Sequence, residues 1–243
     1  MALQIGRAIS GGVHRSLSPV GIVLMGLTAL YVGIFTSSVN TVVVRLLPPE
    51  VQSQSQVGLS LPVSSAVAGV LALGALLFGM VIYIAAARAF TREGTERGTV
   101  TGSLFTRRIG RALLTAVGVN LVVGIATVVG FVLLVIPGIF LVISFAFVVF
   151  AIAVEDARLL ESLRRSWALA RGNRWRLAAL VLLVGVVSAL VSSLGSLASI
   201  VDPAAGQVVS LLVTAPLAVV NYAIIADAFL QVREQQADGG FEA

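Results

Sequence analysis

Long runs of apolar residues without charge limit the folds that this chain can adopt. The longest run, residues 112–154, has no charged residue over 43 positions. A helix of about 20 mostly apolar residues crosses the hydrocarbon core of a bilayer with all its backbone hydrogen bonds made internally. The whole chain is 58% hydrophobic and 11% charged, whereas about 25% of the residues in soluble domains are charged. The sequence therefore predicts an integral membrane protein.

Polar and turn-forming segments divide the apolar sequence into spans. Residues 45–62 contain a proline pair and a Gln/Ser stretch, and residues 88–111 are rich in charge, Gly and Thr, so both segments are predicted loops. A turn at Ile136 to Gly138 splits the longest run, and another turn at residues 202–206 separates the last two spans. The predicted spans are residues 20–44, 63–87, 112–135, 139–154, 177–198 and 207–230.

These spans predict an all-α fold, a polytopic helical membrane bundle of six transmembrane helices with interfacial amphipathic helices. Residues 1–243 are expected to form one membrane domain, with residues 231–243 as a frayed polar tail. The first apolar run is too long for the core of a signal peptide and lacks a small-residue cleavage site, so it is predicted to be a retained span.

The positions of the arginines predict the orientation. All 16 basic residues are Arg, and with both termini in the cytoplasm only Arg45 lies on the outer side. Short loops that keep positive charge stay on the cytoplasmic side. The expected location is the cell (plasma) membrane, crossed several times, with both termini cytoplasmic.

Composition removes several kinds of chemistry. The chain has no Cys, no Lys and one His, which excludes thiolate and His-rich metal sites, a Schiff-base Lys and a phosphate-loop Lys. A Ser/His protease is also not expected, because His14 lies in the N-terminal segment and the sequence has no G-x-S-x-G motif. We therefore predict no catalytic residue, no metal, no cofactor, no nucleic-acid partner and no enzymatic activity.

A charged amphipathic helix is predicted at residues 157–171, between the fourth and fifth spans. Asp156 is the expected N-cap, Gly172 the left-handed end, and Glu161 with Arg165 a supporting i,i+4 pair. One helix face is mainly apolar and the opposite face is charged, which suits the headgroup layer. The helix either connects two spans or binds lipid or a partner, and the candidate binding residues are Arg158, Arg164, Arg165, Trp167, Arg171 and Trp175. The expected apolar face is Leu159, Leu160, Leu163, Trp167 and Ala170.

Few polar groups occur within the spans. Asn120 and Asn221 are candidates for a solute path. On the fifth span, Gly185, Ala189 and Ser193 form one row of small residues beside the row Ser188, Ser192 and Ser196, and both rows favour close helix packing. Near the cytoplasmic surface, Arg88, Glu155 and Asp227 are expected to meet in an ion network, either as a packing lock or as the floor of a polar pocket.

Each pair of spans follows a polar or amphipathic segment. The segments before the first, third and fifth spans are alike in character, and aligning Ser10 with Ser166 also aligns Arg15 with Arg171. We hypothesise three pseudo-repeats, each an amphipathic segment followed by a helical hairpin.

Residues 112–180 carry a pattern that resembles the membrane domain of glycerophosphoryl diester phosphodiesterases and its stand-alone prokaryotic relatives. The shared pattern is I-P-G, an apolar span, an acidic residue, then S-L-R-R-S-W and G-N-R-W. In the fused enzymes a separate soluble barrel performs the hydrolysis, and these 243 residues contain no such barrel. The resemblance thus implies a membrane module without phosphodiesterase activity, and its signature positions here are Pro137, Gly138, Glu155, Ser166, Gly172 and Trp175.

Two functions fit these observations. The first is a non-enzymatic accessory or organising module that binds membrane lipids, including anionic ones, or a separately encoded membrane or enzyme partner at the cytoplasmic leaflet. The alternative is a permease for a neutral or amphiphilic small solute, for which Asn120 and Asn221 would line the path.

Overall fold

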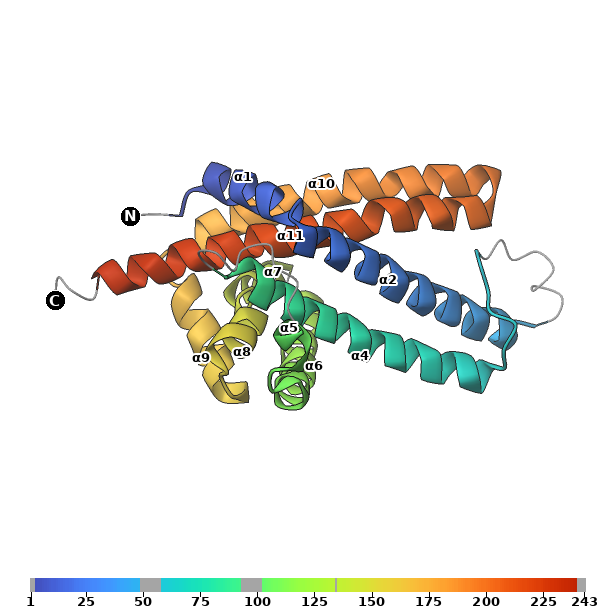
Figure 1. Cartoon of the computed structure of the whole chain (residues 1–243), viewed down its shortest axis with the longest axis horizontal. Coiled ribbons are helices and arrows are strands. Elements are labelled where there is room, and N and C mark those ends of the chain that lie inside the picture. The colour runs from blue at the N-terminus through green and yellow to red at the C-terminus, as the bar shows by residue number, and fades with distance from the viewer. Residues whose placement is uncertain (1–2, 49–57, 93–101, 134, 240–243) are drawn as a thin grey trace. The chain divides into compact units, whose positions relative to one another are not determined.

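The computed structural model describes residues 3–48, 58–92, 102–133 and 135–239, and every regular element in these ranges is a helix (Figure 1). The helices are α1 (Ile5–Ser16), α2 (Pro19–Leu46), α4 (Ser65–Phe90), α5 (Ser103–Thr106), α6 (Ile109–Leu133), α7 (Val135–Ser144), α8 (Val148–Glu155), α9 (Leu159–Ala170), α10 (Arg174–Val201) and α11 (Pro203–Gly239).

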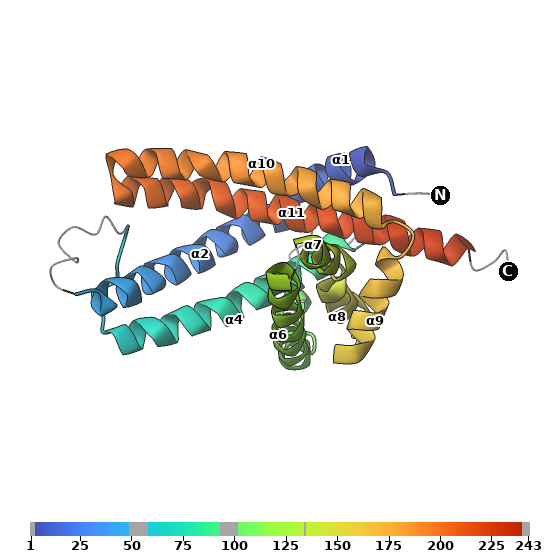
Figure 2. The same ribbon diagram turned by 180° about the vertical axis from the view of Figure 1, so that it is seen from behind.

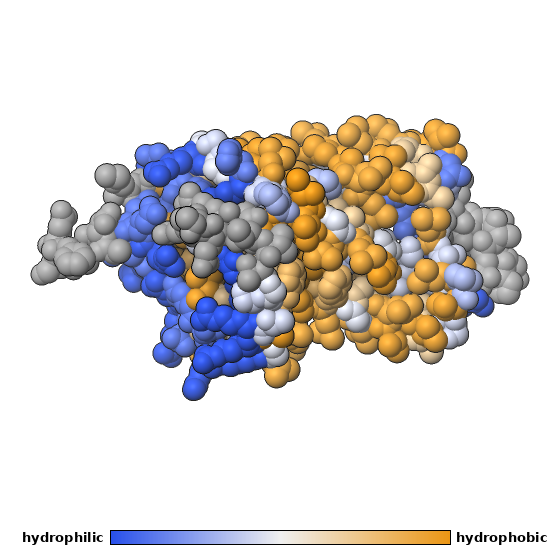
Figure 3. Space-filling model, viewed as in Figure 1, coloured by the Kyte–Doolittle hydropathy of each residue, from blue (hydrophilic) through white to orange (hydrophobic). Residues whose placement is uncertain are grey.

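Within the described ranges, six helical segments are long and apolar enough to cross a membrane, which confirms the predicted all-α membrane fold. Five are the single helices α2, α4, α6, α10 and α11, and the sixth runs from Pro137 to Glu155 through α7 and α8. Large apolar side chains such as Leu114, Val132 and Leu212 lie exposed on these helices. Figure 3 shows hydrophobic residues over much of the visible surface. Such a surface suits lipid as the solvent, so the chain is a multi-pass membrane protein.

Two predicted boundaries are wrong. Residues 231–239 continue α11 and do not form a frayed tail, because Gln231 and Val232 are buried and the Gln236 amide donates to Ala168 O at 3.2 Å. The predicted turn at Ile136 to Gly138 is the first turn of α7, where Pro is tolerated because that N–H needs no helical acceptor. The preceding helix α6 ends at Leu133, before that turn.

The chain forms two compact units of contacting residues. Unit 1 comprises Met1–Ile22, Met80–Val184 and Val220–Ala243, and unit 2 comprises Val23–Gly79 and Gly185–Val219. The helices α2, α4, α10 and α11 each contribute residues to both units. The prediction of one membrane domain stays a prediction.

An aromatic cluster lies at the core of unit 1. The Phe150 and Phe229 rings stack with centroids 5.4 Å apart, and the Phe147 ring meets Phe229 edge-on at 5.8 Å. The Tyr83 ring contacts Phe150 and stacks on Tyr222 with centroids 4.5 Å apart. Such pairs add attraction to the burial of the rings, so α4, α8 and α11 are held together here. Figure 2 shows α8 beside α9.

Small residues bring α10 and α11 together in unit 2 at Gly195 and Gly206, which lie outside the two predicted rows, and in the predicted row of serines Ser188 and Ser192 are half-buried. A Cβ on Gly195 would lie 2.8 Å from Ser210 Cβ, and a Cβ on Gly206 would lie 2.4 Å from Ser199 Cβ. The predicted row of Gly185, Ala189 and Ser193 is exposed. The spacing of residues predicts that α10 has a face of small residues. Which face of α10 meets α11 depends on the turn at Asp202, whose carboxylate accepts from Ala205 N at 2.7 Å.

One glutamine joins three segments of unit 2. Gln207 Oε1 accepts from Leu59 N at 2.7 Å and from Asn40 Nδ2 at 3.1 Å. Its amide nitrogen donates to Thr36 Oγ1 at 3.2 Å and to Ser37 Oγ at 3.1 Å. All the hydrogen-bonding capacity of this side chain is therefore used to hold the segment around Leu59 against α2 and α11.

Replacing Gln207 by Leu removes four hydrogen bonds, and Leu59 N loses the acceptor that Gln207 provides, whereas Asn40 and Thr36 keep bonds to Leu59 O and Val32 O. We expect the free energy of unfolding to fall by about 2 kcal/mol, since half-buried groups regain part of their bonding from water. Denaturant unfolding of the chain in detergent micelles measures the change. Asn120→Leu is the matched control, because the Asn120 amide bonds only Ala116 O of its own helix. Equal losses in the two variants would contradict the prediction.

Candidate functional site

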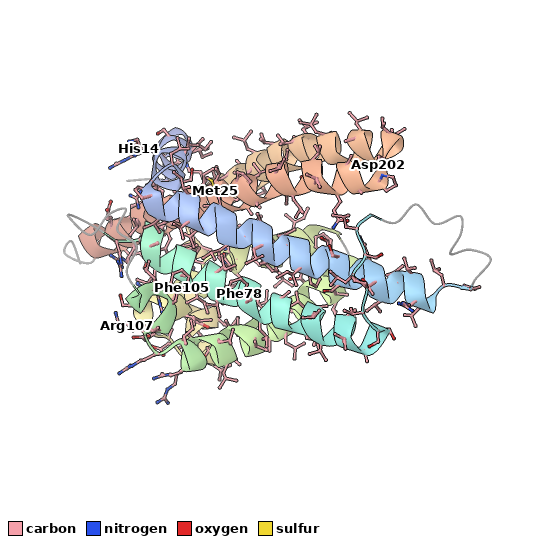
Figure 4. All side chains as sticks on the ribbon, turned by 45° about the vertical axis from the view of Figure 1, so that its right-hand side comes forward. His14, Met25, Phe78, Phe105, Arg107 and Asp202 are labelled. Atoms are coloured by element: carbon pink, nitrogen blue, oxygen red, sulfur yellow. The ribbon has the colours of Figure 1, made fainter. Side chains whose placement is uncertain are left out.

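Charge is concentrated in unit 1. By residue number, fifteen of the sixteen arginines belong to unit 1, and Arg45 alone belongs to unit 2. In Figure 3 the hydrophilic residues gather at the end of unit 1 where α1 and the C-terminal part of α11 lie. In Figure 4, His14 on α1 and Arg107 after α5 project outward from the helices. The charged side chains that could form a functional surface therefore lie on α1, α9 and the segments between them.

The charged helix α9 is present with one predicted cap and one unpredicted cap. Gly172 has the expected left-handed backbone, with φ 92°. Asp156 is not the N-cap: it ends α8 with φ 53°, and its carboxylate pairs with Arg107 at 3.3 Å. Arg158 occupies the N-cap position, where its backbone N–H donates to Glu161 Oε2 at 3.2 Å. Glu161 thus accepts from the Arg158 backbone in place of the predicted pair with Arg165.

The buried face of α9 differs from the predicted apolar face. The buried residues are Ser162, Ser166, Leu169 and Ala170. The chain interrupts its fourth span at residues 145–147, between α7 and α8. Ser166 Oγ donates to Ser144 O at 2.9 Å and accepts from Phe147 N at 3.2 Å. The hydrophobicity of the sequence does not predict this buried face. It packs through the Ser166 hydroxyl, which satisfies two backbone groups at the break between α7 and α8.

The outward face of α9 combines arginine with large apolar side chains. Leu160 is 66% exposed and Trp167 is 38% exposed, and the exposed Arg164 lies between them on the helix. Arg171 follows at the end of the helix and is also exposed. Beyond Gly172, Trp175 is 90% exposed at the start of α10. The structure thus places four of the predicted binding residues on accessible surface.

Trp167 is held in place by its neighbours. The Arg174 guanidinium lies over the Trp167 ring at 4.4 Å and over the Phe140 ring at 4.6 Å. The Phe140 and Trp167 rings meet edge-on with centroids 5.4 Å apart. A cation between two ring faces is attracted to both, so the indole has a fixed orientation at the surface. Sequence reasoning missed Arg174, whose spacing from Trp167 is seven residues.

The two remaining candidates on α9 have different surroundings. Arg165 forms a two-point pair with Glu155, with Nε–Oε2 at 2.9 Å and Nη2–Oε1 at 3.1 Å, and its Nη1 donates to Gln236 at 3.2 Å. Arg158 is exposed. Arg165 therefore joins α8, α9 and α11, whereas Arg158 is available to a ligand.

The predicted ion network of Arg88, Glu155 and Asp227 does not form, because each residue has other partners. Arg88 is buried and donates to Ala153 O at 3.0 Å and to Leu104 O at 3.2 Å. These carbonyls lie near the ends of α8 and α5, so the Arg88 guanidinium donates to carbonyl groups at helix C-termini. Glu155 binds Arg165, and Asp227 binds Arg15.

Asp227 anchors the N-terminal helix. Asp227 is 6% exposed, and its carboxylate pairs with Arg15 at 3.0 Å. Gln231 Nε2 donates to the other carboxylate oxygen at 2.8 Å, and Gln231 Oε1 accepts from Gln4 N at 3.0 Å. Arg15 also donates to Phe90 O. This network ties α1 to α4 and α11.

Glycines allow α1 to lie directly on α11. A Cβ on Gly12 would lie 2.6 Å from the Ile224 backbone, and a Cβ on Gly11 would lie 2.8 Å from Asp227 Oδ1. Sequence reasoning missed this contact. Its signal is the spacing of Ala8, Gly12 and Ser16, three small residues on one helical face that are all buried.

The I-P-G signature shapes the hairpin of α6 and α7. A Cβ on Gly138 would lie 2.6 Å from the Phe131 ring, and a Cβ on Gly130 would lie 3.1 Å from Gly138 Cα. Pro137 is exposed. Of the signature positions, Gly138 thus serves close helix contact and Ser166 serves the break in the fourth span.

The two asparagines proposed for a solute path differ in position. Asn120 is exposed, and its amide donates to Ala116 O of the same helix at 2.8 Å. Asn221 is half-buried on α11. Among the described residues no group of three His, Cys, Asp or Glu side chains is placed to hold a metal ion. The expectation of no cofactor stays a prediction.

Comparison with known proteins gives a family. No curated protein matches the chain, and no solved structure matches it. A family model described as "Domain of unknown function (DUF7847)" matches residues 3–232, which is most of the 243 residues. The chain therefore belongs to the DUF7847 family.

Proposed function

We propose that the protein is a non-enzymatic organising module of the plasma membrane, and that α9 binds anionic lipid at the cytoplasmic leaflet. Both termini lie on the cytoplasmic side in this proposal. The observation that carries it is the outward face of α9, where Leu160, Arg164 and Trp167 are exposed together beside Arg171 and Trp175. Apolar side chains enter the headgroup layer while arginines reach the phosphates.

The distribution of charge supports the orientation. A retained positive charge favours the cytoplasmic side, and Arg45 is the single arginine whose residue number falls in unit 2. Each Arg near an anionic leaflet contributes about 1 kcal/mol of attraction. Arg164 and Arg171 together therefore favour anionic over zwitterionic lipid by roughly tenfold or more.

The tryptophans provide a direct readout. The chain has two Trp residues, Trp167 and Trp175, and both belong to the proposed surface. The full chain in nanodiscs that contain a minor fraction of brominated phosphatidylglycerol is expected to lose more Trp fluorescence than in nanodiscs with the same fraction of brominated phosphatidylcholine. The variant R164Q/R171Q should lose this difference, because it keeps both indoles and removes the charges.

The matched control is R45Q, which removes an exposed arginine from the end of α2 in unit 2. It should retain the preference for phosphatidylglycerol. Equal quenching by the two brominated lipids in the unmodified chain, or an equal loss of preference in R45Q, would refute the proposal.

The organising role includes a separately encoded membrane or enzyme partner, in keeping with the resemblance of residues 112–180 to the membrane domain of glycerophosphoryl diester phosphodiesterases. That resemblance stays a prediction. For the alternative permease, the exposed and locally bonded Asn120 gives no support.

A further inference from the structure

A second charged surface is a groove formed by α1, the start of α2 and the end of α4, which all precede α9 in the chain. The groove has a volume of about 740 Å³. Among the described residues that line it, Arg7, His14, Arg15 and Arg92 are basic and Asp227 is acidic. All belong to unit 1. The groove is thus built to attract an anion.

The Asp227 carboxylate in the groove already has two partners. Asp227 pairs with Arg15 at 3.0 Å and accepts from Gln231 at 2.8 Å. Arg7 and His14 are exposed, and the described part of the chain supplies neither with an ion-pair partner. The buried acid therefore does not compete for the two outer donors.

The two donors share one side of α1. Arg7 and His14 are seven residues apart, close to two helical turns, which places them about 10 Å apart along the helix axis. An arginine fork binds a phosphate through two parallel N–H groups, and an imidazole ring adds a further N–H donor. Arg92, whose Nη2 donates to Ser103 Oγ at 3.2 Å, adds positive charge from the end of α4.

Part of the groove lining is apolar. It includes Leu17, which is 66% exposed, and Pro19, the first residue of α2. Since α2 is one of the helices able to cross the membrane, these two residues lie where a span begins. The groove consequently combines basic residues with an apolar surface beside a span, which matches an amphiphile with an anionic head.

We propose that this groove is a phospholipid site, in which Arg7 and His14 bind a headgroup phosphate and the acyl chains extend past Leu17 along α2. A phosphomonoester such as that of phosphatidic acid fits best, because it offers the N–H donors about two negative charges and three terminal oxygens, and it has no cationic group to be repelled by the arginines. This site rests on the proposed function only in requiring that this end of unit 1 lies at a membrane surface. It uses no residue of α9.

The test is native mass spectrometry of the full chain in detergent micelles, titrated with dioctanoyl phosphatidic acid. We expect the variant R7Q/H14Q to bind this lipid at least about tenfold more weakly than the unmodified chain, since each charged hydrogen bond is worth a sizeable part of a tenfold step. Both side chains are exposed, so the variant should fold normally. H14R keeps N–H donors at this position and should retain binding, and R45Q should bind as the unmodified chain does.

Three further measurements distinguish a lipid phosphate from a free phosphate, and this groove from the surface proposed on α9. Dioctanoyl phosphatidylcholine should bind at least about tenfold more weakly than phosphatidic acid. Glycerol 3-phosphate and inorganic phosphate should also bind weakly; if either competes as well as the lipid does, the groove takes a free phosphate and the lipid assignment is overturned. Undiminished binding by R7Q/H14Q overturns the site altogether. Tight phosphatidic acid binding by R164Q/R171Q, beside a lost preference in the Trp quenching experiment, would show that the two surfaces act separately.

Discussion

Replacing Ser166 by Ala is expected to lower the free energy of unfolding by about 3 kcal/mol. The hydroxyl group satisfies two buried backbone groups, Phe147 N and Ser144 O, at the break between α7 and α8. Each buried polar group that is left without a partner costs about 1–3 kcal/mol. The loss should be measured as the shift in denaturant unfolding of the full chain in bicelles.

Ser162→Ala is the matched control. Ser162 lies one turn earlier on the same helix and is equally buried, but its hydroxyl donates only to Leu159 O of its own helix, at 2.8 Å. Its loss should stay below about 1 kcal/mol, since the Leu159 carbonyl lies in the first turn and keeps its helical partner. Comparable losses in Ser162→Ala and Ser166→Ala would show that Ser166 acts only by filling space.

Replacing Arg15 by Met is expected to have an effect of similar size, about 3 kcal/mol. The change leaves the Asp227 carboxylate buried with Gln231 as its remaining donor. Removing one partner of a buried ion pair costs about 3–5 kcal/mol, and the partial exposure of Arg15 places the value at the low end. Because Arg15 also donates to Phe90 O, α1 should detach first.

Two readouts test this expectation. Detergent-solubilised R15M should unfold at a lower denaturant concentration, and its first helix should be cleaved by protease under conditions where the unmodified chain is protected. R15M/D227L should regain part of the stability, because no carboxylate is then left unpaired. Arg111→Met, at an exposed position at the start of α6, is the control. A stable, protected R15M would mean that the Gly12 contact with Ile224 and the bond from Gln4 N to Gln231 hold α1 without Arg15.

Features that depend on a segment's own composition were predictable. Uncharged runs of more than 20 residues require a helix in lipid whatever their neighbours are, so the six spans followed from the sequence. The helix at α9 and its end at Gly172 followed as well, because a charged segment bounded by a left-handed Gly is a local signal. The exposure of Arg164, Arg171 and Trp175 agrees with the same reasoning.

Pairings between distant segments were not predictable in this way. Arg88, Glu155 and Asp227 are all charged residues near the ends of spans, yet each has a partner from another helix. Asp156 is a good helix N-cap by composition, but the reversal of the chain after α8 gives it a left-handed backbone and two nearby arginines.

By itself the sequence determined that the chain is an all-α membrane protein, where its spans lie and where its charge is concentrated. These properties are set by the free energy of moving each segment from water into lipid, which depends on that segment alone. Only the tertiary structure decided that Ser166 supports a broken helix, that Asp227 belongs to Arg15 and that α1 forms a cationic groove. Those properties depend on which helix faces meet, and helices in lipid meet through small residues and hydrogen bonds that several registers of one sequence could supply.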